Sequence, residues 1–235
     1  MNNIGAEPKT TYGSRPLLFT ALIILAIAAF ITLFVLVDNA YFKFADTHFP
    51  NVGSSAWLAT WWGVVSRAYL LLLIIPLVLW RPRLFGFQIG RTRQYWYMIL
   101  ITLLVNCGVI AAYLWLTGST TPFSGNQWLI TEVVIVPLVE KTFWRGIVFT
   151  VLLVAMRKIY SENASNHLAV WLTGLAFGLL HANNILAGVP IAFVTIQVLN
   201  AAVWGVVYGY ARAKTESLYP PILLHAAMNF TVILF

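Results

Sequence analysis

Three short stretches of this sequence place ionisable or amide side chains inside long apolar runs, where such groups are rare. The stretches are PLVEKTFWRGIVF, FGLLHANN and HAAMN, and their polar residues include Glu140, His181, His225 and Asn229. A buried carboxylate can take a proton from water as a general base. Imidazole and carboxamide groups can donate hydrogen bonds to a negative charge that develops on a substrate oxygen. These four side chains are therefore the candidate functional residues.

The composition shows why such groups need an explanation. Of 235 residues, 60% are hydrophobic and 9% are charged, and the mean hydropathy is +0.83. Soluble domains are nearer half apolar and a quarter charged. We therefore expect an integral membrane protein. An ionisable group at mid-bilayer costs from about 2.5 to more than 10 kcal/mol, so groups kept there generally face the bundle interior and have a function.

Seven apolar segments come close to the roughly 20 residues that a helix needs to cross a bilayer. They predict an all-α membrane bundle of seven or eight transmembrane helices, at residues 16–37, 54–80, 95–118, 128–156, 168–188, 190–210 and 218–235. The longer second and fourth segments are expected to be tilted or broken into two pieces. The first is too long for the apolar part of a cleaved signal peptide, so we expect it to be retained.

The connections between these segments differ in charge. Ten of the fourteen lysines and arginines lie on one side of the predicted bundle, and one, Lys43, lies on the other. The ten are Lys9, Arg15, Arg81, Arg83, Arg91, Arg93, Arg157, Lys158, Arg212 and Lys214. The positive-inside rule then places the N-terminus in the cytoplasm. The net charge of +7 is explained by topology, and a nucleic-acid partner is not expected.

The order of the apolar segments suggests how the chain is organised. We expect a cytoplasmic tail at 1–15, N-terminal helices at 16–94 and a catalytic helical core at 95–235, all within one membrane domain. The predicted location is the plasma membrane of a bacterium. Cys107 lies in an apolar run and is expected to be a packing residue, because free cysteines are commonly buried.

Each candidate also has a purely structural interpretation. Glu140 could neutralise Arg145, although residues five apart on a helix point about 140° apart. His181, taken alone, is more often a packing group. His225 and Asn229 share one helix face and could make a helix–helix hydrogen bond, worth about 0.6 kcal/mol on average in membranes. Helical rise brings the three groups to similar depths in a bilayer core, so together they favour a shared site.

Other polar residues are predicted to be structural. Gln197 and Asn200 lie beside a stripe of small residues that favours close helix packing, and we expect them to make interhelical hydrogen bonds. Arg67 and Glu132 lie nearer to span ends, and His48 and His167 are expected in loops.

Together, EKTFWR (140–145), FGLLH (177–181) and HAAMN (225–229) resemble the three motifs of the CPBP intramembrane proteases. That family includes the type II CAAX prenyl endopeptidases and the Abi bacteriocin-processing and immunity proteins. Its motifs are EExxxR, FxxxH and HxxxN, in this order and each on its own helix. The resemblance covers residues 95–235.

The resemblance implies a role for each matching position. Glu140 would be the general base that activates a water, and His181 would help position that water. His225 and Asn229 would stabilise the oxyanion. The supporting positions of the motifs are matched by Arg145 and Phe177.

The sequence departs from the family pattern at Lys141, where the first motif has its second glutamate. In the usual arrangement that glutamate lies four residues before the arginine, which permits an ion pair along the helix. Here Lys141 and Arg145 place like charges one turn apart. The presumed base, Glu140, is retained, but its electrostatic surroundings are changed.

Three functions follow from these residues. The first is an intramembrane endopeptidase that hydrolyses a membrane-associated peptide, prenylated or a leader peptide, without a cofactor. A zinc version would use Glu140, His181 and His225 as ligands, although no HExxH is present. The second is a catalytically impaired relative that binds a peptide or protein in immunity or regulation, which Lys141 favours. A proton-coupled transporter ranks last, because no inverted repeat is apparent.

Overall fold

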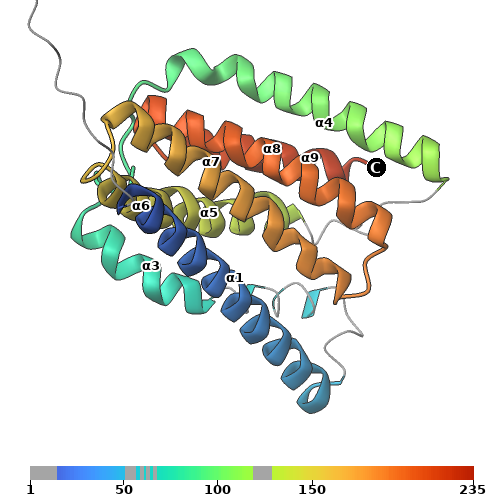
Figure 1. The fold of residues 1–235 in the computed structure, drawn as a ribbon. Helices are drawn as coiled ribbons and strands as arrows, with labels where there is room; N and C mark the ends of the chain where they lie inside the picture. Colours follow the sequence, from blue (N-terminus) through green and yellow to red (C-terminus); the bar gives the residue numbers. More distant parts are fainter. Residues whose placement is uncertain (1–14, 51–56, 59–60, 62–63, 66–67, 119–128) are drawn as a thin grey trace, which may run out of the picture.

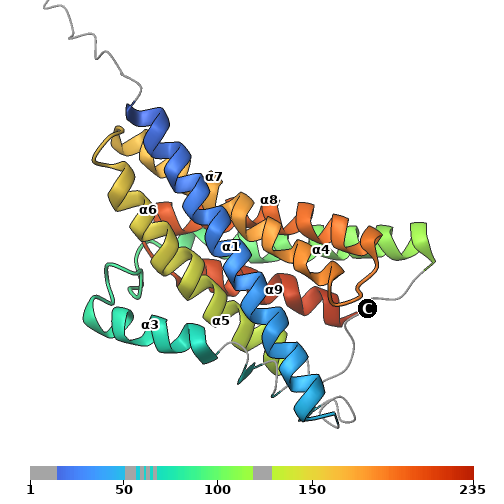
Figure 2. The ribbon, with the colours of Figure 1, turned by 60° about the horizontal axis from the view of Figure 1, so that its bottom comes forward.

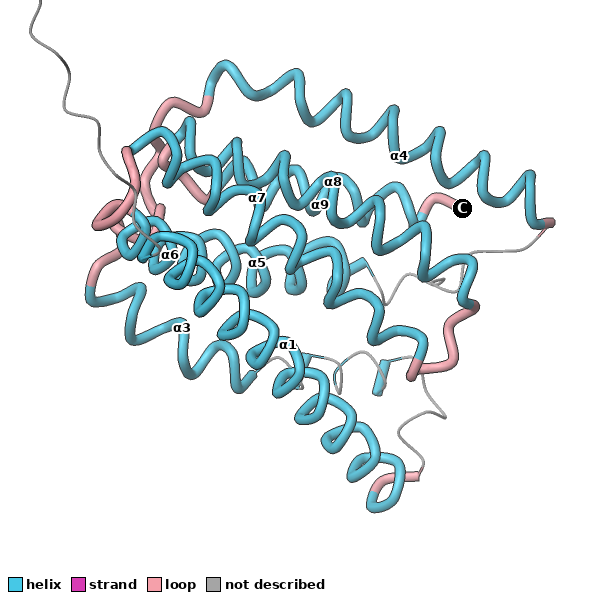
Figure 3. Tube along the Cα trace, in the orientation of Figure 1, coloured by secondary structure: helices cyan, strands magenta, loops and turns pink. Residues whose placement is uncertain are grey.

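A computed structural model describes residues 15–50, 57–58, 61, 64–65, 68–118 and 129–235 (Figure 1). The described chain is helical and contains no strand (Figure 3), which confirms the predicted all-α class. Its α-helices are α1 (Arg15–His48), α3 (Ala68–Trp80), α4 (Trp96–Thr117), α5 (Val136–Lys141), α6 (Phe149–Met156), α7 (Glu162–Leu180), α8 (Ile191–Thr215) and α9 (Tyr219–Ile233).

Four helices in the described part of the chain are long and apolar enough to cross a membrane. They are Leu18–Ala45, Trp96–Thr117, Glu162–Ile185 and Ile191–Thr215. The sequence predicted seven such spans. The difference arises because α3 has 13 described residues, α9 has 15, and the predicted span at 128–156 changes its helical geometry along its length. Large apolar side chains are exposed along all the main helices, as expected of a surface that faces lipid.

The stretch from Leu129 to Met156 is helical throughout but not uniform. Two π-helical segments, Leu129–Ile135 and Thr142–Val148, flank the short α5. Pro137 lies at the start of α5 and has no backbone N–H to donate, which disturbs the regular helical ladder there. Wide turns of this kind are frequent at functional sites, and Glu140 lies between the two.

Helix α1 is longer than the apolar segment that predicted it. It continues past residue 37 to His48. His48 and Lys43 are therefore helical, whereas both were expected in a loop. Arg67 lies outside the described residues.

Helix α7 begins at Glu162, ahead of the predicted start at residue 168. The Ser161 side chain accepts a hydrogen bond from the backbone N–H of Ala164, and an acidic residue occupies the first turn; both features favour a helix start. His167, expected in a loop, is consequently helical, and its Nδ1 lies 3.0 Å from the hydroxyl of Tyr210 on α8.

The pair α7 and α8 forms the centre of the bundle. These two helices make the most extensive contact among the described elements, and Figure 1 shows them side by side through the middle of the molecule. A Cβ added to Gly205 would lie 2.6 Å from the carbonyl oxygen of Gly174, so only glycine permits this approach. The predicted stripe of small residues on α8 is therefore where the two backbones meet.

Replacing Gly205 with alanine should lower the midpoint of thermal unfolding, because the added methyl group would push against the α7 backbone. Overpacking of this kind typically costs about 1–3 kcal/mol. Gly108→Ala on α4 is the matched control, since a Cβ there meets nothing within 4 Å. Circular dichroism of the purified protein in detergent measures both. Equal midpoints for the two variants would contradict the prediction.

Candidate active site

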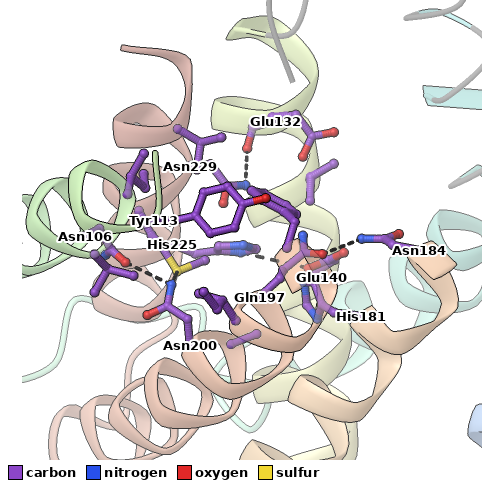
Figure 4. A pocket seen from close by; sticks show the side chains of 18 residues that line it. Asn106, Tyr113, Glu132, Glu140, His181, Asn184, Gln197, Asn200, His225 and Asn229 are labelled. Atoms are coloured by element: carbon purple, nitrogen blue, oxygen red, sulfur yellow. Dashed lines mark hydrogen bonds and ion pairs between the residues drawn. The ribbon is translucent and has the colours of Figure 1, made fainter. Parts of the chain in front are cut away.

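One cavity of about 220 Å³ is lined by polar side chains from several helices. It lies between α4, α5, α8, α9 and the turn after α7 (Figure 4). All four candidate catalytic residues line it: Glu140, His181, His225 and Asn229. The three motif stretches therefore meet in space, although their catalytic roles stay predictions.

Glu140 and His225 face each other across a short gap in this cavity. His225 Nδ1 lies 4.0 Å from Glu140 Oε2. Both atoms are buried, and neither has a hydrogen-bond partner among the described residues. The separation is too long for a direct hydrogen bond. An oxygen atom about 2.8 Å from each of them would complete a normal pair of hydrogen bonds. The gap therefore matches a single water or substrate oxygen.

His181 lies at the end of α7 rather than within a longer helix. The α-helix ends at Leu180, and a 3₁₀ turn, His181–Ile185, follows. His181 Nδ1 lies 2.9 Å from the carbonyl oxygen of Phe177. Because a carbonyl oxygen can only accept, Nδ1 carries the hydrogen, which leaves Nε2 of the neutral ring as an acceptor. The backbone thus selects the tautomer that can accept a hydrogen bond from water.

Asn229 is held by the π-helical segment that precedes Glu140. Its Nδ2 donates to the backbone carbonyl of Glu132 at 2.6 Å (Figure 4). A carboxamide nitrogen carries two hydrogens, so one N–H remains for a ligand. Glu132 itself lines the cavity, which corrects its predicted place near a span end with no part in the site.

Further carboxamides line the same cavity. Asn200 Nδ2 donates to Asn106 Oδ1 at 3.0 Å, and Asn184 Nδ2 donates to Gln197 Oε1 at 2.7 Å. The interhelical hydrogen bonding expected of Asn200 and Gln197 is confirmed, but both residues also belong to the cavity wall. Asn106 and Asn184 were not singled out from the sequence. An isolated amide within the apolar run of α4 is the pattern that would have indicated Asn106.

Phe177 packs against both imidazoles. Its ring centroid lies 4.9 Å from that of His181 and 5.7 Å from that of His225, and both pairs are close to perpendicular. Phe177 is 1% exposed. A rigid aromatic ring in this position fixes the orientation of both histidines, which fits its predicted supporting role.

Lys141 has aromatic neighbours in place of a carboxylate. Its side chain is 0% exposed, and Nζ has no hydrogen-bond partner among the described residues. Nζ lies 3.4 Å from the ring centroid of Phe177 and 4.6 Å from that of Tyr208. Both distances are within the range of cation–π contacts. The residue that departs from the family motif is thus accommodated by the same ring that packs on the two histidines.

Arg145 binds a side-chain hydroxyl and a backbone carbonyl, and not Glu140. One guanidinium nitrogen donates to the Thr173 hydroxyl, and another donates to the Gly205 carbonyl at 2.8 Å. Arg212 in turn donates to the carbonyl of Arg145 at 3.2 Å. Arg145 therefore cross-links the central pair of helices. Arg212, expected in a connection between spans, is buried in the last turn of α8.

The zinc version required three protein ligands around one point. In the part of the chain that the structure describes, no group of three or more His, Cys, Asp or Glu side chains is arranged to hold a metal ion.

Comparison with known proteins identifies one family. Residues 122–231 match the family model described as type II CAAX prenyl endopeptidase Rce1-like. This interval contains all three motif stretches and excludes α1, α3 and α4. No curated protein and no solved structure matches the chain.

Proposed function

Because residues 122–231 belong to the Rce1-like family of type II CAAX prenyl endopeptidases, we propose that this membrane protein hydrolyses a membrane-associated peptide by means of a water activated by Glu140. The observation that carries the proposal is the gap between Glu140 Oε2 and His225 Nδ1. Two buried polar atoms that lack hydrogen-bond partners among the described residues lie 4.0 Å apart on a cavity wall, which suits a water between them. Buried polar groups are otherwise almost always hydrogen-bonded.

Each of the four groups has its own role in the reaction. Glu140 takes a proton from the water, and the water oxygen bonds to the carbonyl carbon of the scissile peptide. His181 Nε2 accepts a hydrogen bond that orients the water. His225 and the remaining N–H of Asn229 are donors for the oxyanion. The C–N bond then breaks, and Glu140 returns its proton to the leaving amine.

The cavity wall suits a peptide segment within the membrane. Apolar side chains from α4 and α8, including Val109, Ile110, Phe193 and Ile196, lie beside the carboxamides. Apolar walls with a few placed polar groups are typical of ligand sites. The carboxamides can pair with backbone N–H and C=O groups of an extended peptide, and the apolar walls can hold its side chains.

A screen of the purified full-length protein tests the function. The panel contains prenylated C-terminal peptides, leader peptides and unmodified apolar peptides. The Glu140→Ala variant is the inactive control. Mass spectrometry should find products with wild type only, carrying one heavy oxygen when the reaction runs in heavy-oxygen water. Activity should persist with a chelator present. Cleavage by Glu140→Ala at the wild-type rate would refute the proposed mechanism.

The alternative is a catalytically impaired relative that binds a peptide or protein without cleaving it. One observation favours it: a buried lysine, Lys141, occupies the motif position of the second glutamate and adjoins the presumed base. Binding of panel peptides with no hydrolysis by wild type would support this alternative.

A further inference from the structure

A second, smaller cavity of about 90 Å³ lies against the same two catalytic candidates. It shares Glu140, His181 and Asn184 with the larger cavity. The larger cavity faces α4, α8 and α9, whereas the smaller one faces α1, which contributes Phe34 and Asp38. Glu140 and His181 therefore line both cavities.

The smaller cavity fits water and not a peptide. Its volume is less than half of the larger cavity's volume of about 220 Å³. At about 30 Å³ for each water molecule in the liquid, this cavity has room for about three. Water in a protein needs two to four polar partners. Asp38, Asn183, His181 and Glu140 offer them, while aromatic rings form the remaining wall.

Contacts with the turn after α7 and with Phe143 hold α1 beside this cavity. Asn39 Nδ2 donates to Asn183 Oδ1 at 3.2 Å, which ties α1 to the turn after His181. Phe30 stacks on Phe143 with ring centroids 5.3 Å apart. Asp38 is 8% exposed, so its carboxylate is held at the cavity and not in lipid. Figure 2 shows α1 crossing α7, and contacts join these two helices.

Hydrolysis requires that water reach Glu140 in each turnover. Each turnover consumes one water, and a bound peptide would fill the larger cavity. The next water must then reach Glu140 from another side. The smaller cavity reaches Glu140 and His181 from the side of α1.

We propose that the smaller cavity supplies the catalytic water and that Asp38 is a positioning residue that holds this water beside Glu140 and His181. The inference rests on the proposed peptidase function. It assigns a role to α1, which lies outside the matched family segment.

Thiol labelling tests hydration of the cavity without any substrate. In a Cys107→Ser background, Leu180→Cys places a thiol on the cavity wall, whereas Leu179→Cys places one on a side chain that is 58% exposed on the lipid-facing surface. A charged methanethiosulfonate should label Leu180→Cys in liposomes and leave Leu179→Cys unmodified. Phe34→Cys and Leu33→Cys form a second matched pair on α1, because Phe34 lines the cavity and Leu33 is 60% exposed. If neither Leu180→Cys nor Phe34→Cys is labelled, the proposed water route is wrong.

Kinetics test the role of Asp38. Asp38→Leu should lower kcat about tenfold while KM changes less than about twofold, because water supply and not peptide binding is impaired. Asp38→Asn should retain more activity, since an amide still hydrogen-bonds to water. Thr32→Leu, an exposed position on the same helix, should behave as wild type. An unchanged kcat for Asp38→Leu would refute the role of Asp38. If wild type cleaves nothing, the proposed function fails, while the labelling result still decides whether the cavity is hydrated.

Discussion

Replacing Glu140 with glutamine should abolish peptide hydrolysis, with a fall in kcat of about 10³-fold. Glutamine keeps the size of the side chain but cannot take a proton from water, and general acid–base groups contribute about 10²–10⁴-fold to rate. Because Glu140 is 21% exposed and its Oε2 atom points into the gap beside His225, the substitution should leave the packing intact. Single-turnover kinetics with a cleaved panel peptide measures the effect separately from product release.

Glu162→Gln is the matched control for this experiment. Glu162 lies in the first turn of α7 and pairs with Arg157 on the exposed surface at 2.8 Å. Exposed pairs contribute about 0–1 kcal/mol, so this variant should keep wild-type kinetics. Binding of the peptide to Glu140→Gln should also be unchanged. A Glu140→Gln enzyme that retains most of its kcat would exclude Glu140 as the base.

Replacing Lys141 with glutamate, the residue of the family motif, should reduce activity at least tenfold and lower the thermal midpoint. Aromatic faces carry partial negative charge, and the new carboxylate would face Phe177 and Tyr208 next to Glu140. Arg145, one turn away, already binds the Thr173 hydroxyl and the Gly205 carbonyl, so the new carboxylate would have to compete with them for it. A buried charge that gains no partner costs about 3–5 kcal/mol. A displaced Phe177 ring would also disturb both imidazoles. The peptide-cleavage assay and circular dichroism measure the two effects.

Lys141→Met separates charge from packing at this position. Methionine fills a similar volume and contacts aromatic rings favourably, so this variant should keep its fold. For Lys141→Glu, a gain of hydrolysis would mean that the native chain is impaired, which would support the binding alternative. The structure favours a loss of hydrolysis in this variant, because the pocket around Lys141 is built from two aromatic rings.

The arrangement of the motif residues could be predicted from properties of each segment taken alone. Hydropathy is a property of each segment, and a carboxylate or imidazole inside an apolar run has few stable positions other than the bundle interior. The four-residue spacing places His225 and Asn229 on one helix face without reference to any other helix. Local patterns alone therefore indicate a shared cavity around Glu140.

Boundaries and lengths were predicted less well, also for physical reasons. Apolar periodicity does not report where a helix ends, because caps and packing decide this. Ser161 extends α7 toward its N-terminus, and the chain turns at His181. The π-helical segment before Glu140 packs on α9, whereas the one after it packs on α3, α7 and α8. No local pattern encodes these contacts.

The sequence by itself determined the membrane class, the all-helical fold and the four side chains that approach one another at the site. The tertiary structure decided which groups surround them: the aromatic rings beside Lys141, the backbone carbonyls that bind Arg145, the ring of carboxamides and the contribution of Asp38 from α1. These contacts join residues that are far apart in the chain. They depend on how helices are oriented against each other, and that orientation follows from the summed packing of the whole bundle.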